Sequence, residues 1–159
     1  MYSKDIDYLN KKIFIDKELR LTFSQKDYCS APDDNIPVYT FKMTDINSSQ
    51  EMGGINLRVG ITENIELYRG NIGFTVFESF RGHHYAGKSC LLLIPFLKIL
   101  DFRSIWLTCN TDNIASKKTL EYIGAIYVDT TMIAEDSPYM GFYPPDARRK
   151  LRCRWNFND

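Results

Sequence analysis

Alternation of hydrophobic and polar positions predicts a chain rich in short β-strands. Six stretches carry the pattern: residues 38–46, 55–61, 72–80, 104–109, 125–133 and 151–157. It is clear in residues 38–46, VYTFKMTDI, where aromatic and polar side chains alternate as in a half-buried strand. In the last stretch, LRCRWNF, the alternation predicts a closing strand with one buried face. The basic run RRKLRCR, residues 148–154, which contains Lys150 and Arg152, is expected on a solvated strand face rather than at a nucleic-acid site.

Two less polar stretches predict helices between the later strands. Residues 86–100 are apolar on most helical faces, which predicts a buried helix. Pro95 is expected to kink this helix, because proline lacks a backbone donor. Residues 113–124 predict a second helix, with Gly124 as its natural C-terminal cap.

The remaining segments are less regular. Residues 1–35 are weakly patterned, with short strands favoured only at residues 11–16 and 19–23. A long loop is expected at residues 137–150. The order of strands and helices predicts a single α/β domain, residues 1–159, with a mixed sheet.

Charge and cysteine content narrow the functional classes. Twenty basic residues balance twenty acidic ones, so no overall field favours nucleic acid or a membrane surface as a partner. The longest apolar run is too short to span a bilayer, and the charged first residues do not resemble a secretory signal. The four cysteines are far apart without a C-x-x-C pair, which favours reduced thiols and a cytoplasmic location.

The stretch RGHHYAGKS, residues 81–89, fits two phosphate-binding patterns. Read from Gly82 it matches G-x-x-x-x-G-K-S, the loop of nucleotide triphosphatases. Such enzymes also need an aspartate at the end of a following parallel strand. Asp101 closes the predicted apolar helix, and Asp112 lies beyond the end of the strand at residues 104–109. Read from Arg81 it gives R-x-x-H-x-A, which is close to the loop that holds the pyrophosphate of coenzyme A in acetyltransferases.

A second motif favours the acetyltransferase interpretation. The stretch NIASKKTLEYIGA places Asn113, Ser116, Gly124 and Ala125 as in the second signature of the GNAT superfamily of acyl-CoA-dependent N-acyltransferases. The two motifs stand in the order and approximate spacing of that family. Residues 38–157 therefore resemble a GNAT acetyltransferase, most closely bacterial members near the ribosomal-protein acetyltransferases. The resemblance implies a mixed, mostly antiparallel sheet flanked by helices.

The resemblance also implies how acetyl-CoA, the co-substrate, would be bound. A backbone N–H around Val76 or Phe77 would hold the thioester oxygen, and amides of the loop and the following helix would hold the pyrophosphate. The residues implied in this binding are Val76, Phe77, Glu78, Arg81, Gly82, His83, His84, Tyr85, Ala86, Gly87, Lys88, Asn113 and Ser116.

The catalytic residues are less well indicated. Glu66, Tyr68 and Asn113 are candidates, with Glu66 acting as a distant base through water. Arg58 and Tyr68 are candidates for the wall of the acceptor site. A surface ion pair is an equally good interpretation of Arg58, and a packed ring is an equally good interpretation of Tyr68. The acceptor is expected to be the primary amine of a small molecule, a protein N-terminus or a lysine.

Several positions depart from the family pattern. His84 replaces a glycine of the pyrophosphate loop, Leu120 replaces the tyrosine that acts as acid, and Asn71 stands where relatives carry a glutamate base. Residues 17–37 show no sign of the two helices usual between the first strands of the family.

These departures leave a second hypothesis open, a catalytically silent acyl-CoA-binding module. No metal is expected, because the adjacent histidines have no third ligand nearby. Cys109 is better read as core filling than as a nucleophile. The expected assembly is a monomer or a homodimer.

Overall fold

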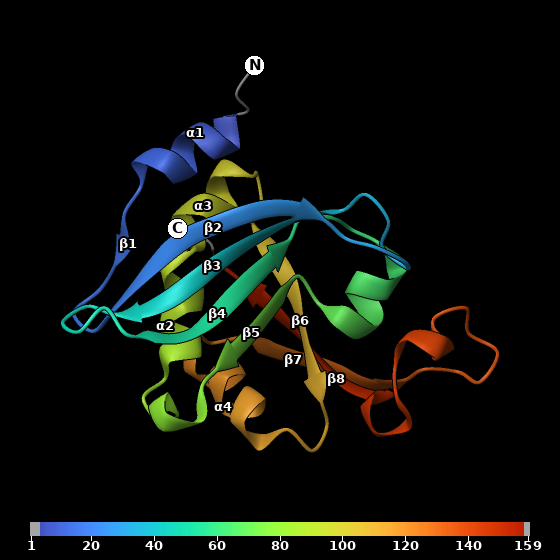
Figure 1. Ribbon diagram of the computed structural model, residues 1–159. Coiled ribbons are helices and arrows are strands. Elements are labelled where there is room, and N and C mark those ends of the chain that lie inside the picture. The colour runs from blue at the N-terminus through green and yellow to red at the C-terminus, as the bar shows by residue number, and fades with distance from the viewer. Residues whose placement is uncertain (1–3, 158–159) are drawn as a thin grey trace.

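The computed structural model describes residues 4–157, which form two antiparallel sheets lying side by side (Figure 1). The first sheet contains, in chain order, β1 (Phe14–Ile15), β2 (Leu19–Tyr28), β3 (Pro37–Asp45), β4 (Glu51–Arg58) and β5 (Ile72–Val76). The second has the order β6-β8-β7 and contains β6 (Ser104–Asn110), β7 (Ile126–Met132) and β8 (Arg149–Asn156). This arrangement confirms the predicted α/β class with antiparallel pairing dominant.

Residues 4–157 also form four α-helices and four short helical turns, which precede or connect the strands. The α-helices are α1 (Lys4–Lys11), α2 (Tyr85–Leu92), α3 (Ile94–Ile99) and α4 (Ile114–Tyr122). The turns are the π-helix η1 (Ile65–Arg69) and the 3₁₀ turns η2 (Glu78–Phe80), η3 (Met140–Phe142) and η4 (Pro145–Ala147). None of the helices in residues 4–157 is long and apolar enough to cross a membrane.

Buried side chains of both sheets and of helices α2 and α3 form one hydrophobic core. Phe41 of β3 and Phe96 of α3 are fully buried, with their ring centres 6.2 Å apart. Tyr39 meets Phe96 edge-on at 5.1 Å, so that β3 and α3 are joined by aromatic contacts. Edge-to-face pairs of this kind add roughly 0.5–1.5 kcal/mol beyond the apolar area they bury.

Three predictions about the elements were wrong. Strands lie at both places expected in residues 1–35, but β2 extends to ten residues, and helix α1 was not expected. The helix expected at residues 86–100 is two helices that meet at Leu93, and Pro95 occupies the first turn of the second, where its missing donor costs nothing. The predicted strand at residues 72–80 ends at Val76, and a 3₁₀ turn follows.

The closing strand also differs from its prediction. Both of its faces are covered, because one face packs in the core and the turn η1 packs over the basic face. Lys150 and Arg152, expected on a solvated face, are each only 8% exposed. In contrast, residues 29–36 form only a turn between β2 and β3, so the expected lack of two α-helices there is confirmed.

Candidate functional site

The two sheets meet at one point and then diverge. At the start of β5, the backbone N–H of Asn71 donates to the carbonyl of Trp106 on β6 at 2.8 Å. Beyond this contact β5 and β6 separate into a V, with α4 below the opening (Figure 1). A pocket of about 240 Å³ lies there, lined by Tyr68, Arg69, Ile72, Gly73, Phe74, Thr108, Cys109, Asn110, Asn113, Ser116, Tyr143 and Lys150.

The side chain of Asn71 connects the two sheets at the point where β5 and β6 meet. Its side-chain amide donates to the carbonyls of Arg58 (3.0 Å) and Gly60 (3.1 Å). Its side-chain oxygen accepts from the backbone N–H of Trp106 at 3.0 Å. The residue is 3% exposed, and the two bonds that it donates need an amide, since a carboxylate can only accept. Asn71 therefore positions the two sheets and has no capacity left to act as a base.

The open edge of β5 presents backbone donors to the pocket. Phe77 donates its N–H to the carbonyl of Met52 on β4, so it is not available, and the prediction that it could hold the thioester oxygen is wrong. In an antiparallel pair, successive residues point their N–H groups to opposite sides. The N–H groups of Phe74 and Val76 therefore point away from β4 toward the gap. Of the two predicted donors, only Val76 fits.

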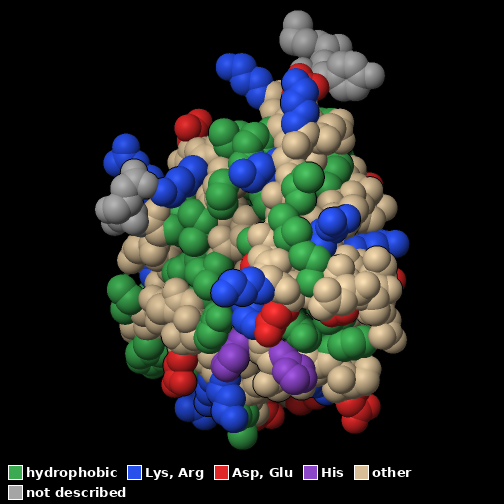
Figure 2. All heavy atoms as spheres, turned by 90° about the vertical axis from the view of Figure 1, so that its left-hand side faces the viewer, with side chains coloured by type: hydrophobic (Ala, Val, Ile, Leu, Met, Phe, Trp, Pro, Cys, Tyr) green, Lys and Arg blue, Asp and Glu red, His purple; other side chains and the backbone are tan. Residues whose placement is uncertain are grey.

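The loop after β5 turns sharply before α2 begins. Gly82 has φ +90° and His84 has φ +60°, both in the left-handed region that favours glycine. The ring of His84 stacks on Tyr122 of α4 at 4.4 Å, which explains how a non-glycine residue is held in this conformation. Figure 2 shows both histidine side chains at the surface, beside acidic and basic side chains. The loop thus has room for the Cβ of His84.

The first turn of α2 offers free backbone donors. Helix α2 begins at Tyr85, so the N–H groups of residues 84–87 have no partner within the helix. The N–H of Lys88 donates to the carbonyl of His84 at 2.9 Å, and its ammonium forms an ion pair with Glu18. Lys88 is thus not a free donor at this helix start, which corrects its assignment as an amide donor to the pyrophosphate.

Gly87 is required by the contact between α2 and α4. A Cβ at this position would lie 2.4 Å from a ring carbon of Tyr122. The close approach sets the start of α2 against the last residue of α4. The start of α4 lies at the pocket, where Asn113 caps the helix and its side-chain oxygen accepts from the N–H of Ser116 at 3.0 Å. At the other end of α4, Gly124 has φ +76°, which confirms it as the C-terminal cap.

Aromatic and basic side chains form the opposite wall of the pocket. Tyr68 is 7% exposed and contacts the ring of Tyr143 at 6.1 Å. The ammonium of Lys150 donates to the side-chain oxygen of Asn110 at 2.6 Å and lies 5.1 Å from the centre of the Tyr143 ring. This wall comes from η1, β8 and the long loop before β8.

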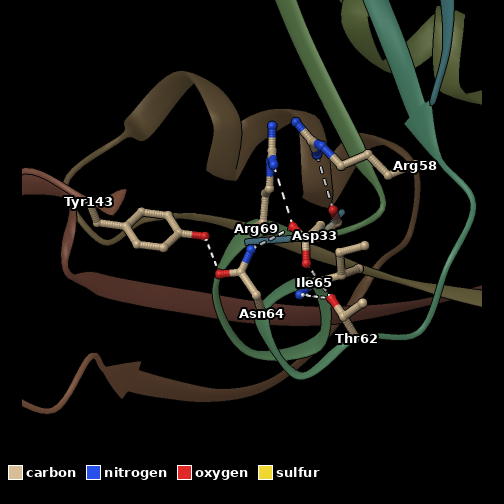
Figure 3. A network of polar contacts seen from close by, with 8 residues as sticks. Asp33, Arg58, Thr62, Asn64, Ile65, Arg69 and Tyr143 are labelled. Atoms are coloured by element: carbon tan, nitrogen blue, oxygen red, sulfur yellow. Dashed lines mark hydrogen bonds and ion pairs between the residues drawn. The ribbon is translucent and has the colours of Figure 1, made fainter. Parts of the chain in front are cut away.

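A buried network centred on Asp33 supports this wall (Figure 3). Asp33 is 1% exposed and accepts from Thr62 (2.6 Å) and Asn64 (2.7 Å), with Arg69 at 3.4 Å. The hydroxyl of Tyr143 donates to the side-chain oxygen of Asn64 at 2.6 Å. The network fixes Arg69 and Tyr143, both of which line the pocket. Nothing in the local sequence around Asp33 indicated it.

Two sequence candidates lie outside the pocket lining. Arg58 is 9% exposed and donates to the carbonyl of Gly70 at 3.1 Å. Its guanidinium lies behind Gly73 of β5. Burial, and after it the charge of Arg69, lowers the pKa of Arg58 to about 10. Glu66 contributes its backbone carbonyl to Arg152, and its side chain does not line the pocket. Of the catalytic candidates, Tyr68 and Asn113 line it.

Other chemistries have little support in the described part of the chain. No group of three or more His, Cys, Asp or Glu side chains within residues 4–157 is placed to hold a metal ion. Cys109 lines the pocket, but burial raises the pKa of its thiol, which disfavours the nucleophilic thiolate. Strand β6 ends at Asn110 and carries no aspartate, as a nucleotide triphosphatase would require.

Comparison with known proteins agrees with this geometry. Residues 13–126 match the profile of the acetyltransferase (GNAT) domain. A search of curated protein sequences finds no match. Among solved structures, the ribosomal L7/L12 α-N-protein acetyltransferase RimL in complex with coenzyme A is 13% identical. It has a TM-score of 0.64, with 92% of this chain and 98% of that one covered.

Two further structures share the fold over a smaller part of their length. One is the Salmonella typhimurium acetyltransferase that modifies the N-terminal serine of ribosomal protein L7/L12 (17% identity, TM-score 0.57). The other is the microcin C7 self-immunity acetyltransferase MccE, solved with acetyl-CoA and AMP (14% identity, TM-score 0.56). Each alignment covers 76% of this chain. It covers 64% of the Salmonella typhimurium protein and 61% of MccE.

Proposed function

Because the chain belongs to the GNAT acetyltransferase family, we propose that it transfers an acetyl group from acetyl-CoA directly to a primary amine. The observation that carries the proposal is the V between β5 and β6, where open backbone donors face a pocket. The acceptor is a small-molecule amine, a protein N-terminus or a lysine, and the location is the cytoplasm, in keeping with four free cysteines. We propose one acetyltransferase domain, since both sheets contribute to one core.

Backbone groups provide most of the binding in this proposal. The open edge of β5 accepts the extended pantetheine arm as a sheet edge accepts an added strand. The N–H of Val76 holds the thioester oxygen as negative charge develops on it. The N–H groups of residues 84–87 and the helix dipole of α2 hold the pyrophosphate.

Proton transfer relies little on side chains. The acceptor must lose a proton before attack, and the pKa of an α-amino group is near ~7.7–8.0 against ~10.4 for lysine. Asn71 is fully bonded and no carboxylate lines the pocket, so water takes up the proton. The leaving thiolate has a pKa near ~8.5 and departs without a strong acid. Leu120 is consistent with this, because it is 5% exposed and packs in the core rather than in the pocket.

Calorimetry with acetyl-CoA and with Mg-ATP tests the binding site. Gly82→Val forces a branched residue to φ +90°, and Ala86→Glu sets a negative charge against phosphate, so each is expected to weaken acetyl-CoA binding at least about tenfold. Lys88→Ala is expected to change binding only about two- to threefold, because Glu18 already pairs with that ammonium. Lys118→Ala, on the exposed side of α4, is the control.

Two outcomes separate the alternatives. Magnesium-dependent ATP binding that is lost in Lys88→Ala, without any acetyl-CoA binding, would contradict the acetyltransferase assignment. Acetyl-CoA binding without amine-dependent release of coenzyme A across a broad amine panel would favour the silent binding module.

A further inference from the structure

Lys150 is an unusual residue in the pocket wall. It is 8% exposed, and lysine side chains are rarely buried without a charged partner. Its ammonium has three protons to donate, and one goes to the side-chain oxygen of Asn110 at 2.6 Å. Within residues 4–157, no carboxylate lies within ion-pairing distance of it. Burial lowers the pKa of Lys150, while Cys109 and Asp146 raise it by smaller amounts.

Two other basic side chains near Lys150 are paired with carboxylates. Arg152, the next residue on the same face of β8, contacts Asp129 through two bonds of 3.0 and 2.9 Å. Arg69, which lines the same pocket, has Asp33 at 3.4 Å. Lys150 has no such carboxylate partner in residues 4–157, so its charge is available to bind an anion.

The pocket as a whole carries positive charge. Its lining contains Arg69 and Lys150 and no Asp or Glu. The guanidinium of Arg58 lies directly behind Gly73, where an added Cβ would meet it at 2.9 Å. In the supporting network, the carboxylate of Asp33 pairs with Arg69 and not with Lys150 (Figure 3).

We propose that the acceptor is an amine that carries an acidic group close to it, and that Lys150 binds this acidic group. The proposal rests on the acetyltransferase function and names its substrate class. The free protons of the ammonium form charge-assisted hydrogen bonds to a carboxylate or phosphate. The same positive charge disfavours an ammonium ion in the pocket, so the acceptor nitrogen is favoured in the neutral form that attacks the thioester. The acidic group belongs either to a small amino acid-like molecule or to the second residue of a peptide.

Two matched series of amines test the proposal with the whole chain. The first compares 4-aminobutyrate, 4-aminobutanamide and 1,4-diaminobutane. The second compares the C-terminally amidated peptides Ser-Asp-Ala, Ser-Asn-Ala and Ser-Lys-Ala. Release of coenzyme A gives kcat/KM for each amine, and calorimetry gives the binding of each amine to the protein already saturated with coenzyme A.

The variants separate charge from fold. Lys150→Met keeps the length of the side chain and removes its charge, and Lys150→Arg keeps the charge. Lys118→Met makes the same change of net charge on an exposed surface. Thermal unfolding shows whether each variant is folded before it is assayed.

In the wild type, the acidic member of one series is expected to exceed its neutral analogue by roughly 10- to 100-fold in kcat/KM, as a charge-assisted bond predicts. Lys150→Met should bring that ratio close to one, whereas Lys150→Arg and Lys118→Met should keep it. The series that shows the preference identifies the source of the acidic group.

Equal use of acidic, neutral and basic amines would overturn the proposal, as would a Lys150→Met variant that keeps the acidic preference. If no amine is acetylated, the proposed function fails and the binding measurement decides the inference. Lys150-dependent binding of the acidic amines would then support it, and its absence would overturn it.

Discussion

Replacement of Asn71 by alanine tests whether this residue joins the two sheets. The change removes three hydrogen bonds and leaves three buried backbone groups without partners, the carbonyls of residues 58 and 60 and the N–H of residue 106. Each orphaned group costs about 1–3 kcal/mol. Water that enters the space offsets part of the sum, so we expect a loss of about 3 kcal/mol. For a protein of this size that corresponds to a fall in Tm of about 6–12 °C.

The assay is urea unfolding followed by circular dichroism, with acetyl-CoA binding measured by calorimetry on the folded variant. Asn56→Ala is the matched control, because Asn56 lies on the adjacent strand β4 and its side-chain oxygen has no hydrogen-bond partner. The control should lose less than about 1 kcal/mol. A loss this small for Asn71→Ala would refute the assignment of Asn71 as the connection between the sheets.

Asn71→Asp adds a test through pH. The aspartate would face the carbonyls of Arg58 and Gly60, and this environment disfavours its charged form. Its pKa in the folded state is therefore raised above the unfolded value of ~3.9. The extra loss of folding free energy is absent below the unfolded value of ~3.9 and grows as pH rises through the folded pKa. The variant should be closest to the wild type near pH 4; a gap in Tm that does not widen toward pH 7 would contradict this.

Three further predictions concern the rest of the chain. A chain that ends at residue 149 should aggregate or unfold without cooperativity, because it lacks the central strand of the second sheet and the buried Trp155; a soluble truncation with a cooperative thermal transition would contradict this. Leu120→Tyr should cost about 1–3 kcal/mol by overpacking the core, and should not raise kcat by the ~10²–10⁴-fold that a placed acid contributes. Under native conditions at pH 8, a thiol reagent should label the half-buried Cys29 first. Burial raises the pKa of Cys90 to about 12 and that of Cys153 to about 11, so their labelling should follow unfolding, and rapid labelling of either would show this burial to be wrong.

The strands and the helix ends could be predicted because their signals are local. Residues 38–46 alternate with the period of a strand, and β3 was found at Pro37–Asp45. The cap at Asn113 and the turn at Gly124 follow from the residue types at helix ends. Helix α1 was missed, since it is only eight residues long and buries one side chain, Leu9.

The acceptor side of the site could not be predicted, because its contacts are distant in sequence. Asp33 meets Thr62, Asn64 and Arg69 at separations of 29, 31 and 36 residues. Lys150 was assigned to a solvated face because alternation along a strand does not reveal what covers its second side. The turn η1 covers it, and no pattern in either segment indicates that they meet.

The strand order of the second sheet has a consequence for synthesis on the ribosome. The first sheet pairs each strand with the one made just before it, so residues 14–76 can pair as they emerge. Strands β6 and β7 both pair with β8 rather than with each other. Neither pairing can form until residues 149–156 have been made. Until then β6 presents an unsatisfied edge to the nascent chain and its surroundings. The pocket is therefore completed only after β8 has been made, and before that the partly folded chain is prone to aggregate.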